Sequence, residues 1–189
     1  MASTYPTTID AFTNPTTSSL LTSPSHAQQH SDINDAMEAV QTKLAIGNTV
    51  IGTYTDYSAS LTLATVTVGN GTKTAYYARV NDYVHFFGKF LLGSTSVILG
   101  PNIQVTLPIS LDTNMRPTGQ PLGLSYSYDV SSGGLYNGDV LSVGVASAVY
   151  LSAFLTNGTY SLRTNMNATV PFTWTTGDTF FWNLYYKAA

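Results

Sequence analysis

Residues 72–92 read TKTAYYARVNDYVHFFGKFLL, and this stretch decides the fold class of the chain. Two segments rich in aromatic and β-branched side chains, Thr72 to Val80 and Tyr83 to Leu92, flank the dipeptide Asn81-Asp82. Asn and Asp favour tight turns, whereas the flanking residue types favour extended backbone. The pattern predicts two antiparallel strands joined by a short turn.

The same pattern of extended segments separated by turn residues continues on both sides of this hairpin. Upstream, Gly69-Asn70-Gly71 follows an alternating apolar segment from Leu61 and predicts another hairpin into the strand at Thr72. No crossover helices separate the strands, which excludes a parallel α/β architecture. About eight to ten short strands predict a mainly β fold, with a single antiparallel β-sandwich or jelly-roll-like domain over residues 61–189. The further predicted strands are Ile103 to Leu107, Leu124 to Tyr128, Val140 to Val145, Ala148 to Leu155, Tyr160 to Leu162 and Thr179 to Tyr186.

Residues 1–24 differ in composition and predict an extended attachment arm. They contain no glycine and repeat proline, serine and threonine, and each proline pushes its predecessor towards extended geometry. Too few apolar residues are present for the arm to fold on itself. It is either an unanchored tail or a strap laid over a neighbouring subunit. The side chains that would anchor such a strap are Tyr5, Ile9, Phe12, Leu20 and Leu21.

One short helix is predicted over residues 25–47, followed by a linker over 48–60. Ser25 and Gln28 fit a capping box, and Gly47 supplies a stop. Apolar residues recur with the 4-3-4 spacing of a heptad seam. This stripe packs either against the β-domain or against copies of itself, and its narrowness favours self-association about a symmetry axis. The predicted oligomerisation seam comprises His26, His30, Ile33, Met37, Val40 and Leu44.

Charge and composition narrow the function classes. Of the 189 residues, 43% are apolar, enough for a core, and only 9% are charged. The formal net charge is −3 and the seven basic residues are scattered, which argues against binding nucleic acid. No cysteine is present, and no run reaches the roughly 18 apolar residues of a membrane span. The start lacks a secretory signal, so we expect assembly in the cytoplasm and release by lysis.

The titratable residues do not suggest catalysis, and we expect neither an enzyme nor a cofactor. His85 lies between Val84 and Phe86, as a packed, hydrogen-bonded histidine would. Four aspartates are predicted at turn positions, where Asp commonly hydrogen-bonds its own backbone: Asp82, Asp129, Asp139 and Asp178. A glycosidase pair among them is the alternative, with only their loop location in its favour.

His26 and His30 have the i, i+4 spacing that places two imidazoles on one helix face. The sequence His-Ala-Gln-Gln-His lacks the glutamate of the zinc-protease motif. Three such helices around an axis would stack rings of imidazoles able to hold a metal or an anion. Surface or capping histidines without a metal are the expected outcome.

Aromatic residues are abundant, with 13 Tyr and 8 Phe in the chain. Such rings can stack on sugars, so a glycan-binding surface is one interpretation. Close to the C-terminus they alternate as in a strand buried on both faces, by a core or by a subunit contact. We favour a subunit interface here, formed by Phe180, Trp182, Tyr185 and Tyr186.

Two stretches resemble known virion proteins. The first is Tyr5-Pro6-x-x-Ile9-Asp10-x-Phe12, then His26 to His30, then Asp35-Ala36-x-x-Ala39-Val40-x-x-x-Leu44-x-x-Gly47. The second is Val66 to Thr72, Tyr76-x-x-Arg79-Val80, Val84-His85-Phe86, Gly93 to Ser96 and Val105 to Pro108. The first resembles the N-terminus of fibre and minor tail proteins of tailed bacteriophages. The second is similar to a β-module of minor virion proteins of phages that infect actinobacteria.

The resemblance implies a homotrimeric structural protein on the virion surface, without catalytic residues. One helix leading almost directly into one β-domain suits a capsid decoration protein or short head fibre. Its arm would bind the major capsid protein, and its β-domain would project. The alternative is a minor tail or tail-fibre protein that contacts tail or baseplate proteins and a host surface glycan.

Overall fold

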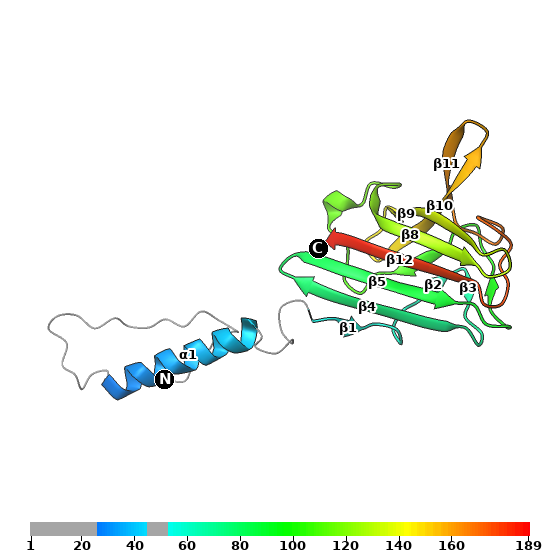
Figure 1. Cartoon of the computed structure of the whole chain (residues 1–189). Helices are drawn as coiled ribbons and strands as arrows, with labels where there is room; N and C mark the ends of the chain where they lie inside the picture. The colour runs from blue at the N-terminus through cyan, green and yellow to red at the C-terminus, as the bar shows by residue number, and fades with distance from the viewer. Residues whose placement is uncertain (1–25, 45–52) are drawn as a thin grey trace. The chain divides into compact units, whose positions relative to one another are not determined.

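The protein is described by a computed structural model over residues 26–44 and 53–189 (Figure 1). It separates into a helical unit within residues 1–53 and a β-domain over 54–189. As predicted, the chain is mainly β, with a large antiparallel sheet after one short helix. In order, the elements are α1 (His26–Leu44), β1 (Thr55–Asp56), β2 (Leu63–Ala64), β3 (Val66–Thr67), β4 (Thr72–Val80), β5 (Tyr83–Leu91), β6 (Val97–Ile98), β7 (Gln104–Thr106), η1 (Thr113–Met115), β8 (Pro121–Asp129), β9 (Gly134–Ser142), β10 (Ala148–Asn157), β11 (Tyr160–Asn165) and β12 (Thr179–Lys187).

The helix α1, His26–Leu44, lies inside the predicted range of 25–47, and the remaining residues of that range lie outside what the structure describes. On its polar side, Gln28 Nε2 donates to Asp32 Oδ1 at 2.7 Å, an i, i+4 pair that supports a solvent-facing turn. Among the described residues, no helix is long and apolar enough to cross a membrane.

The hairpin predicted within residues 72–92 is present. Strands β4 and β5 pair in antiparallel register from Thr72 opposite Leu91 to Val80 opposite Tyr83. Asn81 supplies the turn with a positive φ of 54°, which Asn tolerates better than most residues. The local prediction of this strand pair is confirmed.

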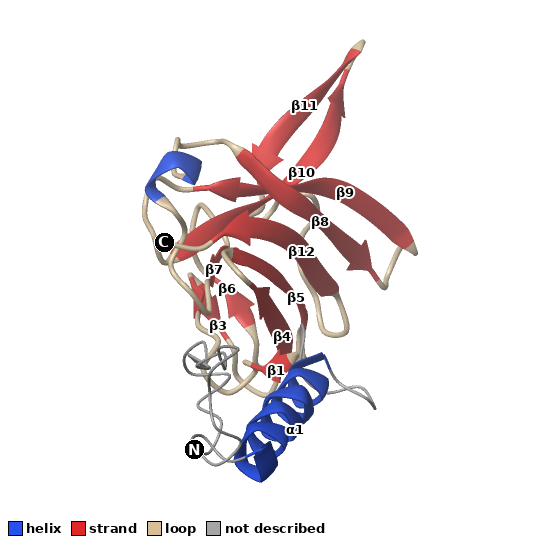
Figure 2. Ribbon diagram, turned by 90° about the vertical axis from the view of Figure 1, so that its left-hand side faces the viewer, coloured by secondary structure: helices blue, strands red, loops and turns tan. Residues whose placement is uncertain are grey.

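One ten-stranded sheet dominates the β-domain, in the order β1-β4-β5-β12-β8-β9-β10-β7-β2, with β11 on β10 (Figures 1 and 2). The last strand, β12, lies between β5 and β8. The middle of the sheet is therefore completed only when the end of the chain is in place. Beyond it, β10 and β11 continue as a hairpin that projects from the domain (Figure 2).

The sheet curls, so that its two ends share one core. Leu63 of β2 and Val105 of β7 belong to the same buried cluster as Phe86 of β5. Tyr57 bridges the two ends: its ring lies 5.8 Å from that of Phe86, and its hydroxyl lies 3.4 Å from Leu107 O. The largest fully buried side chains are Trp182, Tyr186, Phe86, Phe90, Phe180, Leu61, Ile103, Leu111, Leu151, Met166, Leu184 and Val84.

The predicted hairpin through Gly69-Asn70-Gly71 is wrong, although its turn forms. Gly71 N donates to Val68 O at 2.9 Å, but the segment before the turn pairs elsewhere: β3 with β6 and β2 with β7. A positive φ of 66° at Thr65 separates β2 from β3. The turn is instead fixed by Asn70, whose Oδ1 accepts from Thr95 N at 3.0 Å.

The β-domain also begins earlier than the predicted residue 61. Strand β1 pairs with β4, with Thr55 opposite Tyr77. Tyr57 N then donates to Ala75 O at 2.8 Å. The end of the predicted linker, 48–60, is thus part of the sheet.

Candidate functional site

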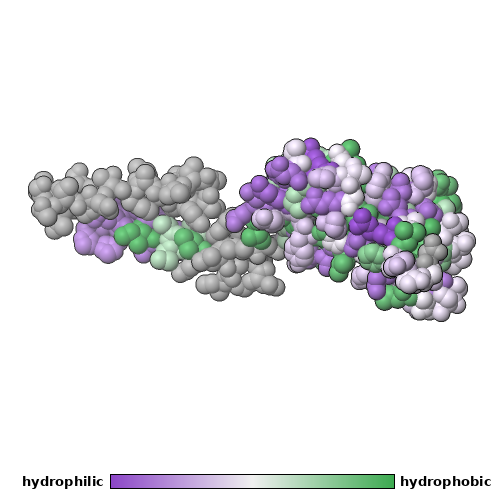
Figure 3. All heavy atoms as spheres, turned by 90° about the horizontal axis from the view of Figure 1, so that it is seen from above, coloured by the Kyte–Doolittle hydropathy of each residue, from purple (hydrophilic) through white to green (hydrophobic). Residues whose placement is uncertain are grey.

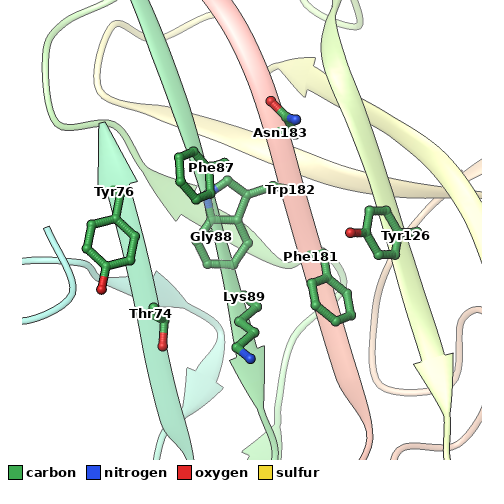
Figure 4. A pocket seen from close by; sticks show the side chains of 9 residues that line it. All are labelled: Thr74, Tyr76, Phe87, Gly88, Lys89, Tyr126, Phe181, Trp182 and Asn183. Atoms are coloured by element: carbon green, nitrogen blue, oxygen red, sulfur yellow. The ribbon is translucent and has the colours of Figure 1, made fainter. Parts of the chain in front are cut away.

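An aromatic groove lies on the outer face of the layer formed by β4, β5, β12 and β8, opposite the core (Figure 4). Its volume is about 200 Å³. The side chains that define the aromatic groove are Tyr76, Phe87, Phe181, Tyr126, Lys89 and Thr74.

Cross-strand pairing places these side chains. Phe87 lies opposite Tyr76, with ring centroids 5.8 Å apart, and Phe181 stacks on Tyr126 at 4.5 Å. Lys89 lies opposite Phe181, in the row next to that of Phe87. Successive rows on one face are two residues, or about 7 Å, apart. Two aromatic pairs therefore flank the groove, one towards β4 and one towards β8.

The groove floor depends on Gly88. A Cβ built at this position would lie 2.4 Å from Trp182 Cζ2 and 2.5 Å from Thr74 O. Real Cβ atoms do not approach other heavy atoms so closely, so the packing of the buried indole requires glycine here. The buried Trp182 Nε1 has no hydrogen-bond partner within the described residues.

His85 is held in a hydrogen-bonded cluster beside the groove. Its Nε2 lies 2.8 Å from Asn183 Oδ1, its Nδ1 lies 2.6 Å from the Tyr54 hydroxyl, and its ring stacks on Tyr185 at 4.1 Å. A carbonyl oxygen can only accept, so Nε2 donates to Asn183, while Nδ1 forms its hydrogen bond with the Tyr54 hydroxyl. Both ring nitrogens are then used. His85 is thus hydrogen-bonded and packed against a neighbouring ring, as the sequence predicted.

The prediction that aromatic residues near the C-terminus form a subunit interface is corrected by the structure. Phe180, Trp182 and Tyr186 are buried in the core of their own domain, and only Tyr185 is exposed, at 62%. In a strand paired on both sides, alternate residues face the core, and these three share one parity. The Tyr186 hydroxyl donates to Ile109 O at 2.8 Å.

The helix carries the predicted apolar stripe on its surface. The side chains of Ile33 and Met37 are 56% and 54% exposed, and Val40 is half-buried. Figure 3 shows green, hydrophobic side chains next to purple, hydrophilic ones on this unit. The side chain of Leu44 and the attachment residues Tyr5, Ile9, Phe12, Leu20 and Leu21 lie outside what the structure describes.

The two helix histidines lie together, as their spacing predicts. His26 Nε2 and His30 Nε2 are 2.6 Å apart, and the rings stack at 4.5 Å. Within the described ranges, no group of three or more His, Cys, Asp or Glu side chains gathers as a metal site would require. One chain alone thus brings two imidazoles together.

Asp139 was predicted at a turn but lies within β9, where its carboxylate pairs with Arg163 at 3.3 Å. Two other predicted turn carboxylates have structural roles. Asp129 accepts hydrogen bonds from the hydroxyls and backbone amides of Ser131 and Ser132, and these bonds hold its pKa below the ordinary value of 3.8. Asp178 accepts from the amides of Val130 and Thr175. Both carboxylates therefore tie down neighbouring turns near the ends of β8 and β12.

The aromatic groove was not among the sites predicted from the sequence. Its signal is present in the doubled aromatics Phe86-Phe87 and Phe180-Phe181. In a strand, the second member of such a pair must face away from the first. The alternation near the C-terminus predicts a strand buried on both faces, whereas one face of this layer is open.

Comparison with known proteins finds no relative: no family model, no curated protein and no solved structure matches the chain.

Proposed function

We propose that the chain is a non-catalytic structural protein of a virus particle, which self-associates through α1 and displays its β-domain. The observation that carries the proposal is the exposed stripe of Ile33 and Met37. A lone helix of this length is marginal in water, so burial of its apolar side is what keeps such a helix formed. Three copies around an axis would bury the stripe with the heptad-like spacing found here.

In the first placement, the N-terminal segment binds the major capsid protein of an assembled shell. A protein that binds only the assembled shell stabilises it by mass action. This placement makes the chain a trimeric decoration protein or short head fibre. The resemblance of its N-terminal residues to phage fibre and minor tail proteins supports attachment to a particle.

The second placement is a minor tail or tail-fibre protein that contacts a host surface. The aromatic groove favours this function, because an open face with grouped rings offers a partner large contact area at low cost in side-chain entropy. Counting copies of the protein per particle separates the two placements. Hundreds of copies support the shell, whereas a handful support the tail.

Self-association is tested on the purified protein by light scattering. Met37→Asp places a charge in the stripe and is expected to dissociate the trimer. Ser31→Asp is the matched control, because it adds the same charge at an exposed helix position outside the stripe. A monomeric wild-type protein, or a trimer indifferent to Met37→Asp, contradicts the proposed use of α1.

A further inference from the structure

We propose that the aromatic groove of the β-domain binds one ring of an acidic saccharide, with the carbon faces of the sugar on the aromatic pairs and its carboxylate at Lys89. This proposal names a ligand class for the second placement, a tail protein that contacts a host surface. It rests on that placement for its biological setting. The site itself lies within the β-domain.

The rings at the groove are not part of the core. Tyr126 is exposed, and Tyr76, Phe87 and Phe181 are half-buried on the outer face (Figure 4). A soluble domain tolerates single exposed aromatics, but a contiguous group on one face marks a contact surface. Because the two pairs are held by cross-strand packing, their positions are set before any ligand arrives.

Polar groups are interspersed with these rings. Lys89 is exposed at the groove and forms no ion pair with a carboxylate of the described residues. Thr74, opposite it on β4, adds a hydroxyl, and the Tyr76 and Tyr126 hydroxyls add two more. The groove thus combines apolar ring faces with several donors and one cation. That mixture is what a pyranose needs, because its two faces carry C–H groups while its rim carries hydroxyls.

Size and backbone pairing disfavour other occupants. At about 200 Å³ the groove is smaller than the roughly 300–1,000 Å³ of sites for drug-sized ligands and suits a single ring. Strands β5 and β12 are interior strands, so their backbone groups are already paired and cannot receive a peptide strand. A single lysine in a chain of net charge −3 is a poor site for a nucleic-acid backbone.

Charge complementarity selects an acidic sugar. The aromatic groove contains one cation, Lys89, and no acidic residue. A sugar carboxylate would form a charge-assisted hydrogen bond to the ammonium group, which a neutral sugar cannot. Since Lys89 is exposed, this bond contributes to selectivity more than to affinity and weakens as salt screens it.

The test uses the purified full-length protein and three acidic glycan probes: oligogalacturonate, hyaluronan oligomers and sialylated oligosaccharides. Methyl-esterified oligogalacturonate and cello-oligosaccharides are the neutral probes. Titration calorimetry is expected to show binding of at least one acidic probe, weaker at high salt and weakened about threefold on esterification. Absence of binding to all three acidic probes, or equal binding of acidic and neutral probes, overturns the proposal.

Variants locate the site. Phe181→Ala is expected to weaken binding about tenfold, by analogy with loss of a stacked aromatic platform. Lys89→Gln is expected to weaken it about threefold and to remove the salt dependence. Tyr160→Ser is the matched control, since Tyr160 is 80% exposed on β11, outside the groove, and its loss should leave binding unchanged.

The two groove variants distinguish loss of the binding site from loss of the fold. Lys89 is a surface residue, so Lys89→Gln keeps the fold and remains informative if Phe181→Ala proves unstable in a thermal melt. Binding that survives both groove variants, or that falls with Tyr160→Ser, refutes the site. Saccharide binding is measured without any particle, so its failure leaves the proposed self-association and virion attachment to their own tests.

Discussion

The change Gly88→Ala tests the packing on which both the core and the groove floor depend. The added methyl group would lie 2.4 Å from Trp182 Cζ2 and 2.5 Å from Thr74 O. The indole is 1% exposed and the carbonyl belongs to a paired strand, so neither can move freely. Overpacking of this kind costs about 1–3 kcal/mol.

A smaller effect acts in the opposite direction. Replacing glycine by alanine within a strand restricts the unfolded chain and recovers about 0.5–1 kcal/mol. Because the methyl group would overlap both Trp182 and the Thr74 carbonyl, we take the upper part of the overpacking range. The net expected loss is about 2 kcal/mol in the free energy of unfolding, or roughly 6–8 °C in melting temperature for a domain of this size.

A double-mutant cycle, measured by urea denaturation, identifies the cause of the stability loss in Gly88→Ala. Trp182→Phe removes Cζ2 and leaves a cavity, at a cost of about 2 kcal/mol. In that background Gly88→Ala should cost about 1 kcal/mol less, with the remainder due to the contact with Thr74 O. Gly134→Ala in β9 is the control, since its nearest neighbours are the side-chain ends of Ser132 and Tyr136.

Two results would refute this reasoning. One is Gly88→Ala with the stability of the wild type. The other is a cycle in which the two costs add within about 0.5 kcal/mol, which would mean that the methyl group and the indole do not meet.

Two further predictions concern buried polar groups. Tyr186→Phe leaves Ile109 O without its donor and is expected to cost about 1 kcal/mol at neutral pH by urea denaturation. Burial raises the pKa of Tyr186, so its contribution is complete below the ordinary value of 10.0 and is lost as the pH rises above it, a loss absent from the variant. For Asp129, whose pKa is lowered by Ser131 and Ser132, the contribution is present above pH 3.8 and is lost as the pH falls through the lower pKa of the folded state. Asp129→Asn should therefore lower stability at pH 7 and flatten the acid limb of the pH profile, and an unchanged acid limb would contradict the role given to the carboxylate.

Candidate sites were predictable to the extent that they depend on local spacing. The i, i+4 spacing of His26 and His30 placed their rings together, because a helix fixes which residues share a face. The stripe through Ile33 and Met37 was predictable for the same reason. The aromatic groove was not, because it combines side chains from four strands whose order local sequence does not encode.

Local patterns along the chain predict three features correctly: the β4–β5 hairpin around Asn81, the helix α1, and the mainly antiparallel β class. Each follows from side-chain period and turn chemistry within a few residues. Three other features depend on packing across the whole domain: β3 pairs with β6, β12 lies between β5 and β8, and Phe180 faces the core while Phe181 faces the groove. Strand pairing and the buried face of each strand depend on contacts between residues far apart in the sequence. A one-residue change of register would move the core-facing side chains of a strand to its outer face.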